Sequence, residues 1–279
     1  LFSSKAYIAT RFYSQKFLKE ILKLINENHF DFIQLEGLYS LQYITDIRKH
    51  YQGKIIYRSH NIEYQIWSRN AVETNNLLKK LYFKNLSRRL KKLEKKYLNS
   101  YDFILPITQT DASCYMQLGN QKPLLVTPFG IEINQQNTNN VALKTDQSIN
   151  FIGALDWIPN QNGITWFIKN CFPAILKRYP DVRLKLAGRN APARFIKKLN
   201  HPNIDYLGQI ENINDFYQLP GPFIVPLFSG SGMRVKIIEA MAYKKAIITT
   251  RLGAEGIDAT NNENIVIANS NLEFIDNVI

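Results

Sequence analysis

Short apolar runs rich in β-branched and aromatic residues alternate along the chain with longer stretches whose apolar positions recur every three or four residues. The short runs predict strands and the longer stretches predict helices, because side chains repeat every two residues in a strand and every 3.6 in a helix. The predicted strands are 31–36, 54–59, 102–107, 123–127, 149–153, 182–187, 204–207, 222–227, 246–250 and 264–268. The predicted helices include 12–28, 40–50, 68–98, 109–118, 161–178 and 232–243.

This alternation predicts an α/β protein with parallel sheets that are covered by helices on both faces. It is interrupted at 128–147, which is rich in Asn and Gln and poor in bulky apolar residues. We therefore predict a linker at 128–147 between two doubly wound domains, 1–127 and 148–279. Two such domains leave a cleft between them, and ligands in this architecture bind beyond the carboxyl ends of the strands.

Composition narrows the class of protein. The 279 residues are 45% hydrophobic, which excludes disorder along the whole chain, and 35 Lys and Arg against 23 Asp and Glu give a net charge of +12. The two cysteines, Cys114 and Cys171, lie in apolar, helix-like segments and form neither a disulfide framework nor a zinc motif. The longest stretch without charge, 216–233, contains three prolines and three glycines and does not predict a membrane-spanning helix. A reducing, cytoplasmic compartment is expected.

The most informative stretch is 222–243, where a predicted strand runs into Ser229-Gly230-Ser231-Gly232 and then into a helix. Glycines at such a turn let backbone N–H groups approach a ligand, and the helix N-terminus carries partial positive charge, so a phosphate site is expected. Arg234 and Lys236 add two cations, and Glu239 lies in an apolar run where its carboxylate needs a partner such as a ribose diol. The structural alternative is a glycine-rich turn with a partly exposed Lys236–Glu239 pair.

At these residues the sequence resembles a known family. The stretch GSGMRVKIIEAMAYKKAIITTRLGAEGI resembles the donor-binding segment of the retaining glycosyltransferases with the two-Rossmann GT-B fold, the family 4 group of bacterial polysaccharide enzymes. Four further segments resemble the family in the same order along the chain: RSHNIEYQIW, TPFGIE, FIGALDWIPNQNGITWF and DVRLKLAGRN.

The resemblance implies a transferase that moves a sugar from a nucleotide-diphosphate donor to a saccharide or lipid-linked acceptor in cell-surface polysaccharide or lipopolysaccharide synthesis. Glu239 matches the second glutamate of the family's E-x7-E motif, which holds the nucleotide ribose. The first glutamate falls on Ser231, so that carboxylate is missing here. The remaining donor-binding candidates are Gly230, Ser231, Gly232, Met233, Arg234, Lys236, Arg189, Gly253 and Glu255.

On the acceptor side, the resemblance assigns His60, which follows the strand KIIYRS, as the active-site histidine that contacts the transferring sugar or the acceptor. Glu36, Gly37 and Asn61 are further candidates there, although a glutamate at the end of a strand is often only solvated. The resemblance implies no metal and no other cofactor, because the helix dipole and the cations stabilise the leaving diphosphate.

The segment 79–96 contains nine cations and one acid, Glu94. Leu78, Leu81, Leu86, Leu90, Leu93 and Tyr97 recur at helical spacing, so we expect one face to pack and the other to be positive. Such a helix is either a solvated face or a site for anionic lipid headgroups, which would place the protein on the inner face of the plasma membrane. Nucleic acid is not expected as a partner, because no nucleic-acid-binding motif is present.

Two rival functions remain at this stage. One is another GT-B enzyme that acts on nucleotide sugars, such as an epimerase, or a phosphorylase. The other is a basic non-catalytic protein that binds a membrane or nucleic acid. The resemblance also implies an N-terminal domain that lacks its first strand and a C-terminal domain that lacks its final helix.

Overall fold

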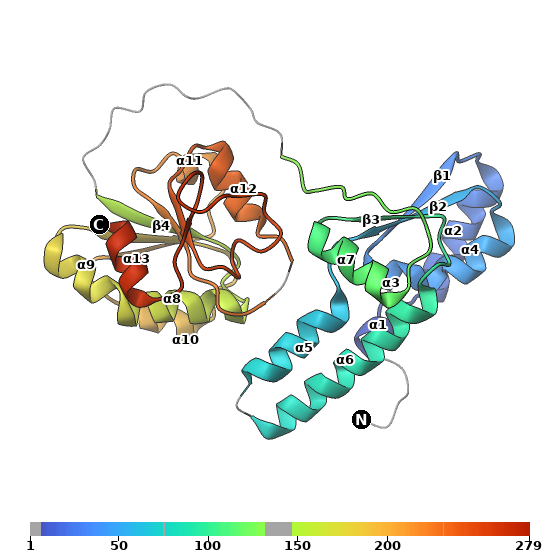
Figure 1. Ribbon diagram of the computed structural model, residues 1–279, viewed down its shortest axis with the longest axis horizontal. Helices are drawn as coiled ribbons and strands as arrows, with labels where there is room; N and C mark the ends of the chain where they lie inside the picture. Colours follow the sequence, from blue (N-terminus) through green and yellow to red (C-terminus); the bar gives the residue numbers. More distant parts are fainter. Residues whose placement is uncertain (1–6, 75, 132–146, 231) are drawn as a thin grey trace. The chain divides into compact units, whose positions relative to one another are not determined.

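The computed structural model describes residues 7–74, 76–131, 147–230 and 232–279, and its contacts divide the chain into two units (Figure 1). The first unit consists of Leu1–Phe129 with Gly230–Gly232, and the second of Gly130–Ser229 with Met233–Ile279. Most of the predicted linker, 132–146, lies outside the described residues.

The first unit is a parallel three-stranded sheet in the order β1-β2-β3, which helices surround (Figure 1). Helices α5 and α6 lie side by side as a hairpin, in which Trp67 and Phe83 are in ring contact at 5.3 Å. The elements are α1 (Tyr7–Thr10), α2 (Gln15–Glu27), β1 (Phe32–Glu36), α3 (Gly37–Ser40), η1 (Leu41–Tyr43), α4 (Ile44–His50), β2 (Lys54–Ser59), α5 (Glu63–Glu73), α6 (Leu77–Tyr97), β3 (Phe103–Pro106) and α7 (Gln109–Leu118).

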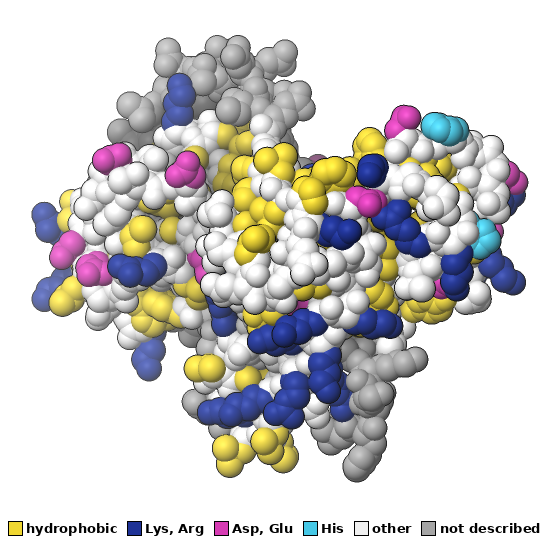
Figure 2. All heavy atoms as spheres, turned by 45° about the vertical axis from the view of Figure 1, so that its right-hand side comes forward, with side chains coloured by type: hydrophobic (Ala, Val, Ile, Leu, Met, Phe, Trp, Pro, Cys, Tyr) yellow, Lys and Arg dark blue, Asp and Glu magenta, His cyan; other side chains and the backbone are white. Residues whose placement is uncertain are grey.

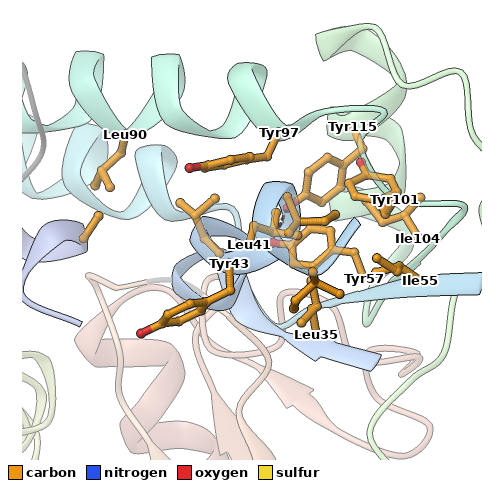
Figure 3. Packing of buried hydrophobic residues seen from close by; sticks show 14 of the residues in the cluster. Leu35, Leu41, Tyr43, Ile55, Tyr57, Leu90, Tyr97, Tyr101, Ile104 and Tyr115 are labelled. Carbon is orange, nitrogen blue, oxygen red and sulfur yellow. Dashed lines mark hydrogen bonds between the residues drawn. The ribbon is translucent and has the colours of Figure 1, made fainter. Parts of the chain in front are cut away.

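The core of the first unit is rich in tyrosine (Figure 3). The Tyr57 ring packs on Tyr101 at 5.3 Å and edge-on against Tyr115 at 6.2 Å. A buried hydroxyl is costly without a partner, and here the Tyr115 hydroxyl lies 2.8 Å from Ser59 Oγ and 3.3 Å from the Tyr57 hydroxyl. These hydrogen bonds fix the end of β2, where the chain continues into His60.

The second unit is a parallel six-stranded sheet in the order β6-β5-β4-β7-β8-β9. The chain starts in the middle of the sheet, builds outward to one edge, and then crosses back to build the other half, which is the doubly wound order. The elements are β4 (Ser148–Ile152), α8 (Ile158–Asn170), α9 (Phe172–Arg178), β5 (Arg183–Ala187), α10 (Ala193–Ile196), η2 (Lys197–Leu199), β6 (Ile204–Gly208), α11 (Ile213–Tyr217), β7 (Phe223–Val225), α12 (Val235–Ala242), β8 (Ile247–Thr249), β9 (Val266–Ile267) and α13 (Asn271–Val278).

Alternation along these strands builds one core on each face of the sheet. In β7, Ile224 joins the core formed with α8, α9 and α13, whereas Phe223 and Val225 join the core formed with α11 and α12. Figure 1 shows these two groups of helices on opposite sides of the strands. All residues of β4, β7 and β8 are buried, because a parallel sheet covered on both faces leaves no strand face to solvent.

Several predicted elements differ from the structure, and three of them show why. The predicted helix 68–98 is two helices, because Thr74 is extended and the Asn76 side chain caps α6 by accepting from the N–H of Lys79. The predicted helix 161–178 is also two helices, since Pro173 lies in the first turn of α9 and cannot continue α8. The predicted strand 123–127 makes only an isolated bridge, between Leu124 and Ile104.

Helix α8 crosses the end of β7 at a distance that only glycine allows. A Cβ on Gly163 would lie 1.9 Å from the carbonyl oxygen of Pro226. We expect Gly163→Ala to lower the free energy of unfolding by about 2 kcal/mol, because overpacking outweighs the helix preference of alanine. Urea unfolding measures this change. Gly130→Ala is the control, because a Cβ at Gly130 meets no atom within 4 Å, and equal stability of the two variants would contradict the packing argument.

Candidate functional site

The loops that follow the central strands of the second unit lie together at the carboxyl edge of its sheet, where hydrogen bonds connect them. Strand order reverses between β4 and β7, so this edge is where a doubly wound sheet binds ligands. The loop after β4 is tied to the loop after β5, since Leu155 N donates to Arg189 O at 2.9 Å and Asn190 Nδ2 donates to Asp156 Oδ2 at 3.2 Å. A Cβ on Gly188 would lie 2.0 Å from the Gly153 carbonyl oxygen, so the two loops touch through their backbones.

Lys236, in the first turn of α12, reaches this edge. Its ammonium donates to Asn160 Oδ1 at 2.9 Å and lies 4.3 Å from the centre of the Phe151 ring. A Cβ at Gly153 would lie 2.8 Å from Lys236 Nζ and 3.0 Å from Asn160 Nδ2, so the absence of a side chain there makes room for both. The Asn160 side chain is itself held, because its Nδ2 donates to Ala154 O at 2.7 Å.

Two cationic side chains, Lys236 and Arg234, lie at the N-terminus of α12. Burial, and then the neighbouring Arg234, lower the pKa of Lys236 to about 7. Arg234 is 5% exposed and precedes α12 as its N-cap residue, with its guanidinium carbon 5.8 Å from the centre of the Trp157 ring. Two cations at a helix N-terminus oppose the helix dipole, so an anion bound beside them would be stabilised by both charges and by the dipole.

Glu239 lies one turn further along α12 and has a protein partner. The hydroxyl of Tyr217, which is fully buried, donates to Glu239 Oε2 at 2.7 Å. The Tyr217 ring is stacked between Phe223 at 5.2 Å and Tyr243 at 5.1 Å, which fixes the direction of its hydroxyl. Oε1 of Glu239 makes no hydrogen bond with the described residues.

The structure does not contain the alternative Lys236–Glu239 pair, and α8 starts earlier than predicted. Lys236 and Glu239 do not pair with each other, because Lys236 turns to Asn160 and Glu239 accepts from Tyr217. Helix α8 begins at Ile158, three residues before the predicted start of 161, and its N-cap residue is Trp157. The Asp156 carboxylate accepts from Asn190, whose backbone has a positive φ of 57°.

The turn between β7 and α12 has left-handed backbone at both glycines, with φ of +105° at Gly230 and +82° at Gly232. This conformation explains why glycine occurs at these positions. Ser231 lies outside the described residues, and Met233 is half-buried just before Arg234. Helix α12 begins at Val235, three residues after the predicted start of 232.

The remaining donor-side candidates lie in loops at the carboxyl ends of other strands. Arg189 follows β5 by two residues, and its side chain is exposed. Gly253 lies in the turns after β8, where a Cβ would approach Thr249 Oγ1 to 2.0 Å, so its role there is close packing. Glu255 is half-buried in the same turns.

Sequence reasoning misses Tyr217, Trp157 and the role of Asn160 at this edge. No motif marks Tyr217, which ends a short helix in an apolar run typical of a core segment. Trp157 and Asn160 lie within the segment that resembles the family, but nothing in the sequence connects them with the cations of α12. Only the fold brings Asn160 to Lys236, which is 76 positions away.

In the first unit, the ends of β1 and β2 bring three of the acceptor-side candidates together. His60 Nε2 lies 2.5 Å from Glu36 Oε2, with both side chains about half exposed. Glu36 Oε1 also accepts from Gln34 Nε2. Gly37 has a φ of +71°, and a Cβ there would lie 3.9 Å from His60 Nδ1. Asn61 contributes its backbone carbonyl oxygen, which accepts from Ser59 Oγ at 3.2 Å.

Two further carboxyl groups, those of Glu63 and Glu94, lie near the start of α5. Glu63 accepts from the Tyr39 hydroxyl at 2.9 Å, and burial raises its pKa. Glu94, on α6 and 3% exposed, accepts from the N–H of Glu63 at 2.8 Å and so caps α5 from outside. Burial raises the pKa of Glu94 to about 8, and its Oε2 has no hydrogen-bond partner among the described residues.

The described residues contain no group of three His, Cys, Asp or Glu side chains arranged to hold a metal ion. Within the same residues, no helix is both long enough and apolar enough to cross a bilayer.

Comparison with known proteins supports a glycosyltransferase. Residues 146–279, just under half of the chain, match the family model described as Glycosyl transferases group 1. A curated relative from Klebsiella pneumoniae, described as an uncharacterized 44.6 kDa protein in the cps region, is 25% identical over 261 residues. These residues cover 90% of this chain and 65% of that protein, so the chain spans less than two thirds of its relative's length.

Solved structures show the fold. Sucrose-phosphate synthase from Thermosynechococcus elongatus superimposes with a TM-score of 0.67 at 14% identity, over 94% of this chain and 67% of that one. Anabaena HepE, solved in complex with UDP and glucose, gives a TM-score of 0.68 at 13% identity, over 94% of this chain and 70% of that one. The predicted GT-B fold, with two Rossmann-like parallel-sheet units, is confirmed.

The buried carboxyl of Glu94 makes the stability of the first unit depend on pH. Because its pKa is raised from 4.5 in the unfolded chain to about 8, the folded state holds a proton that the unfolded state releases. Its stabilising contribution is therefore complete below about pH 4.5 and is lost as the pH rises to about 8. We expect Glu94→Gln, which stays neutral, to weaken this dependence in urea unfolding across that range. Glu20→Gln, an exposed acid on α2, is the control, and an unchanged slope in Glu94→Gln would contradict the assignment.

Proposed function

We propose that the protein is a retaining glycosyltransferase that transfers a sugar from a nucleotide-diphosphate donor to a saccharide or lipid-linked acceptor. In this proposal the second unit holds the donor and the first unit holds the acceptor. The group 1 family model on residues 146–279 and the neighbours of the same fold support the reaction class. The relative encoded in a cps region supports a role in surface polysaccharide synthesis.

The observation that carries the proposal is the ammonium of Lys236, which lies at the N-terminus of α12 beside Arg234 and donates a hydrogen bond to a neutral oxygen, that of Asn160. An ammonium removed from water keeps its charge readily only beside an anion, and the two influences on the pKa of Lys236, burial of the ammonium and Arg234, both disfavour the charged form. A diphosphate at this edge would place negative charge beside the Lys236 ammonium. It would accept hydrogen bonds from the ammonium and be stabilised by the helix dipole, which is also how the leaving diphosphate would be stabilised in the reaction.

The nucleoside of the donor would then lie along α12, beside the carboxylate of Glu239. Tyr217 fixes Oε2, and Oε1 is left to accept from a ribose hydroxyl. A carboxylate with one fixed oxygen loses little freedom when it binds, so the contact with the ribose is pre-organised. Gly230, Ser231, Gly232, Met233, Arg189, Gly253 and Glu255 remain proposed donor contacts. HepE, a neighbour with the same fold, was solved with UDP-glucose, which supports a uridine nucleotide as the first ligand to test.

On the acceptor side we propose that His60 contacts the transferring sugar or the acceptor hydroxyl, with Glu36 orienting its ring. The 2.5 Å contact between His60 Nε2 and Glu36 Oε2 fixes which ring nitrogen faces the carboxylate and leaves Nδ1 beside Gly37. Gly37 and Asn61 complete the proposed acceptor side.

The proposal includes two further expectations. The reaction needs no metal, so transfer is expected to be the same in excess EDTA. The protein works in the cytoplasm at the inner face of the plasma membrane, where a lipid-linked acceptor is presented.

Lys236 makes diphosphate binding depend on pH. Because its pKa is about 7 in the free protein and an anion favours its charged form, binding above pH 7 takes up a proton. We expect calorimetric titration with UDP to show this uptake at about pH 8 as a difference between buffers of unequal ionisation enthalpy, and affinity to fall as the pH rises. Lys236→Met should remove the uptake and weaken binding about tenfold or more, the loss expected for a charged hydrogen bond.

Lys245→Met is the matched control for this experiment. Lys245 is another partly buried lysine of the second unit with a lowered pKa, but it precedes β8 and so lies at the amino end of that strand. Its ammonium donates to Leu219 O at 2.8 Å. If Lys245→Met changes UDP binding as much as Lys236→Met does, or if neither changes it, the diphosphate assignment fails.

His60 and Glu36 are expected to affect transfer and not donor binding. We expect His60→Ala to lower the transfer rate by about a hundredfold or more, and Glu36→Gln by about tenfold, with UDP affinity and melting temperature unchanged. The assay measures the transfer of a radiolabelled sugar from UDP-glucose or UDP-galactose to a lipid extract of cells that produce the protein. His50→Ala, on the last residue of α4, is the control. Equal loss of UDP binding and of transfer would place His60 outside the acceptor side.

A further inference from the structure

Apolar side chains are exposed where α5 ends and α6 begins. Val72, Leu77, Leu78 and Leu81 are each between 66 and 79% exposed, and Tyr82 is 46% exposed. They occupy the end of the α5–α6 hairpin, and we call these five residues the hairpin tip. Figure 2 shows hydrophobic side chains gathered at the lower end of the molecule, where this hairpin ends. Single exposed leucines are common, but a cluster of five large apolar side chains marks an interaction surface.

The tip differs from what the helical spacing predicts. Leu86, Leu90 and Tyr97 are buried as expected, whereas Leu78 and Leu81 are exposed. At 100° per residue, Leu77 and Leu81 lie on the face opposite Leu90. The packed face of α6 is therefore filled by the first unit itself, and the leucines of the tip belong to a second, outward apolar surface.

The same outward face becomes cationic further along the helix. Lys84 and Arg88 follow Leu77 and Leu81 at spacings of three and four residues, so all four lie in one row. Lys79, Lys84, Arg88, Lys91, Lys92, Lys95 and Lys96 are exposed. Glu94, the one acid of α6, is buried on the other face. Figure 2 shows Lys and Arg side chains above the apolar end.

We propose that the hairpin tip inserts into the surface of an anionic bilayer, with the cations of α6 contacting the lipid phosphates behind it. A helix rises about 1.5 Å per residue, so Lys84 and Arg88 lie about 10 and 16 Å along the axis from Leu77. Apolar side chains of interfacial helices reach about 5–10 Å into the boundary between headgroups and acyl chains, which places these cations at the level of the headgroups. Long basic side chains also extend toward the interface.

Charge and chemistry favour a bilayer over other occupants. A second copy of this chain would bring two strongly cationic helices together, and their repulsion would oppose packing of the leucines. Nucleic acid would use the cations but would leave the five apolar side chains of the tip in water. An anionic membrane provides both an apolar phase and negative charge, in the order in which the helix presents its residues. The inference deepens the membrane location that is part of the proposed function, and it does not depend on the proposed transfer reaction.

Sedimentation of the full chain with vesicles tests the proposal. We expect binding to vesicles of equimolar phosphatidylcholine and phosphatidylglycerol, and at least tenfold weaker binding to phosphatidylcholine alone. Leu77→Ser with Leu81→Ser should weaken binding to the anionic vesicles about tenfold or more, because two insertion contacts are lost. Lys84→Gln with Arg88→Gln should weaken binding at low salt and reduce its dependence on salt.

Matched controls use residues elsewhere on the surface. Leu125→Ser with Leu272→Ser removes two leucines of similar exposure, and Lys16→Gln with Lys19→Gln removes two exposed cations of α2. Neither control is expected to change vesicle binding. Melting temperatures and UDP binding are measured for every variant, so that misfolding is recognised separately from lost membrane contact.

Insertion is distinguished from surface adsorption by a fluorescent label that responds to polarity. The label is attached at Leu81→Cys and, as a control, at Leu125→Cys, and it should shift to the blue with anionic vesicles only at position 81. The proposal is overturned if the chain does not bind anionic vesicles, or if the leucine pair and its control bind equally. It is also overturned if Leu77→Ser with Leu81→Ser abolishes a dimer in sedimentation equilibrium and leaves lipid binding unchanged, which would assign the tip to a second copy.

Discussion

The ammonium of Lys236 occupies the space that a side chain at position 153 would fill. The arrangement of side chains at the carboxyl edge of the second sheet depends on this close approach. Glycine at 153 lets the first turn of α12 approach the loop after β4. Asn160 then meets the ammonium with a neutral oxygen, which holds the side chain without cancelling its charge. A carboxylate in place of Asn160 would form an ion pair and leave no electrostatic demand for a ligand. The amide at position 160 leaves the edge positive, and burial and then Arg234 lower the pKa of Lys236.

The same edge illustrates what sequence could and could not predict. The strand at 54–59 and the helix at 109–118 have the predicted bounds, because each combines a clear apolar pattern with end signals such as the capping Thr108. The glycine-rich turn before α12 and the cations after it were also recognisable, since both are local. Tyr217 was not, because its role depends on packing between Phe223 and Tyr243 and on a hydrogen bond across 22 positions. Helix α13 went unpredicted although Ser270 and Glu273 form a capping box, a signal visible in the sequence.

Errors in α6 come from a different cause. The leucines of 78–97 recur every three or four positions except between Leu81 and Leu86, which are five apart. This gap places Leu81 on the face opposite Leu90, so the leucines do not form one packed face. Leu86 and Leu90 lie against the first unit, whereas Leu78 and Leu81 extend past it in the hairpin. The period of 3.6 predicts which residues share a face, and it does not predict where the neighbouring structure ends. The break at Thr74, which sets the start of α6, was equally hidden within a continuous helical pattern.

The basic residues that give the net charge of +12 therefore act in two different ways. Most cations of α6 are exposed and hydrated, and they can act on a partner only through their summed field, which salt screens. Arg234 is buried, and half-buried Lys236 has an enclosed ammonium, so each charge acts over a short distance in a medium of low polarity, where the energy of an ion contact is larger. Exposed charge of this kind suits attraction to an extended anionic surface, and enclosed charge suits the selection of one small anion. A single excess of basic residues thus serves two physically different kinds of recognition, and only the burial of each cation tells them apart.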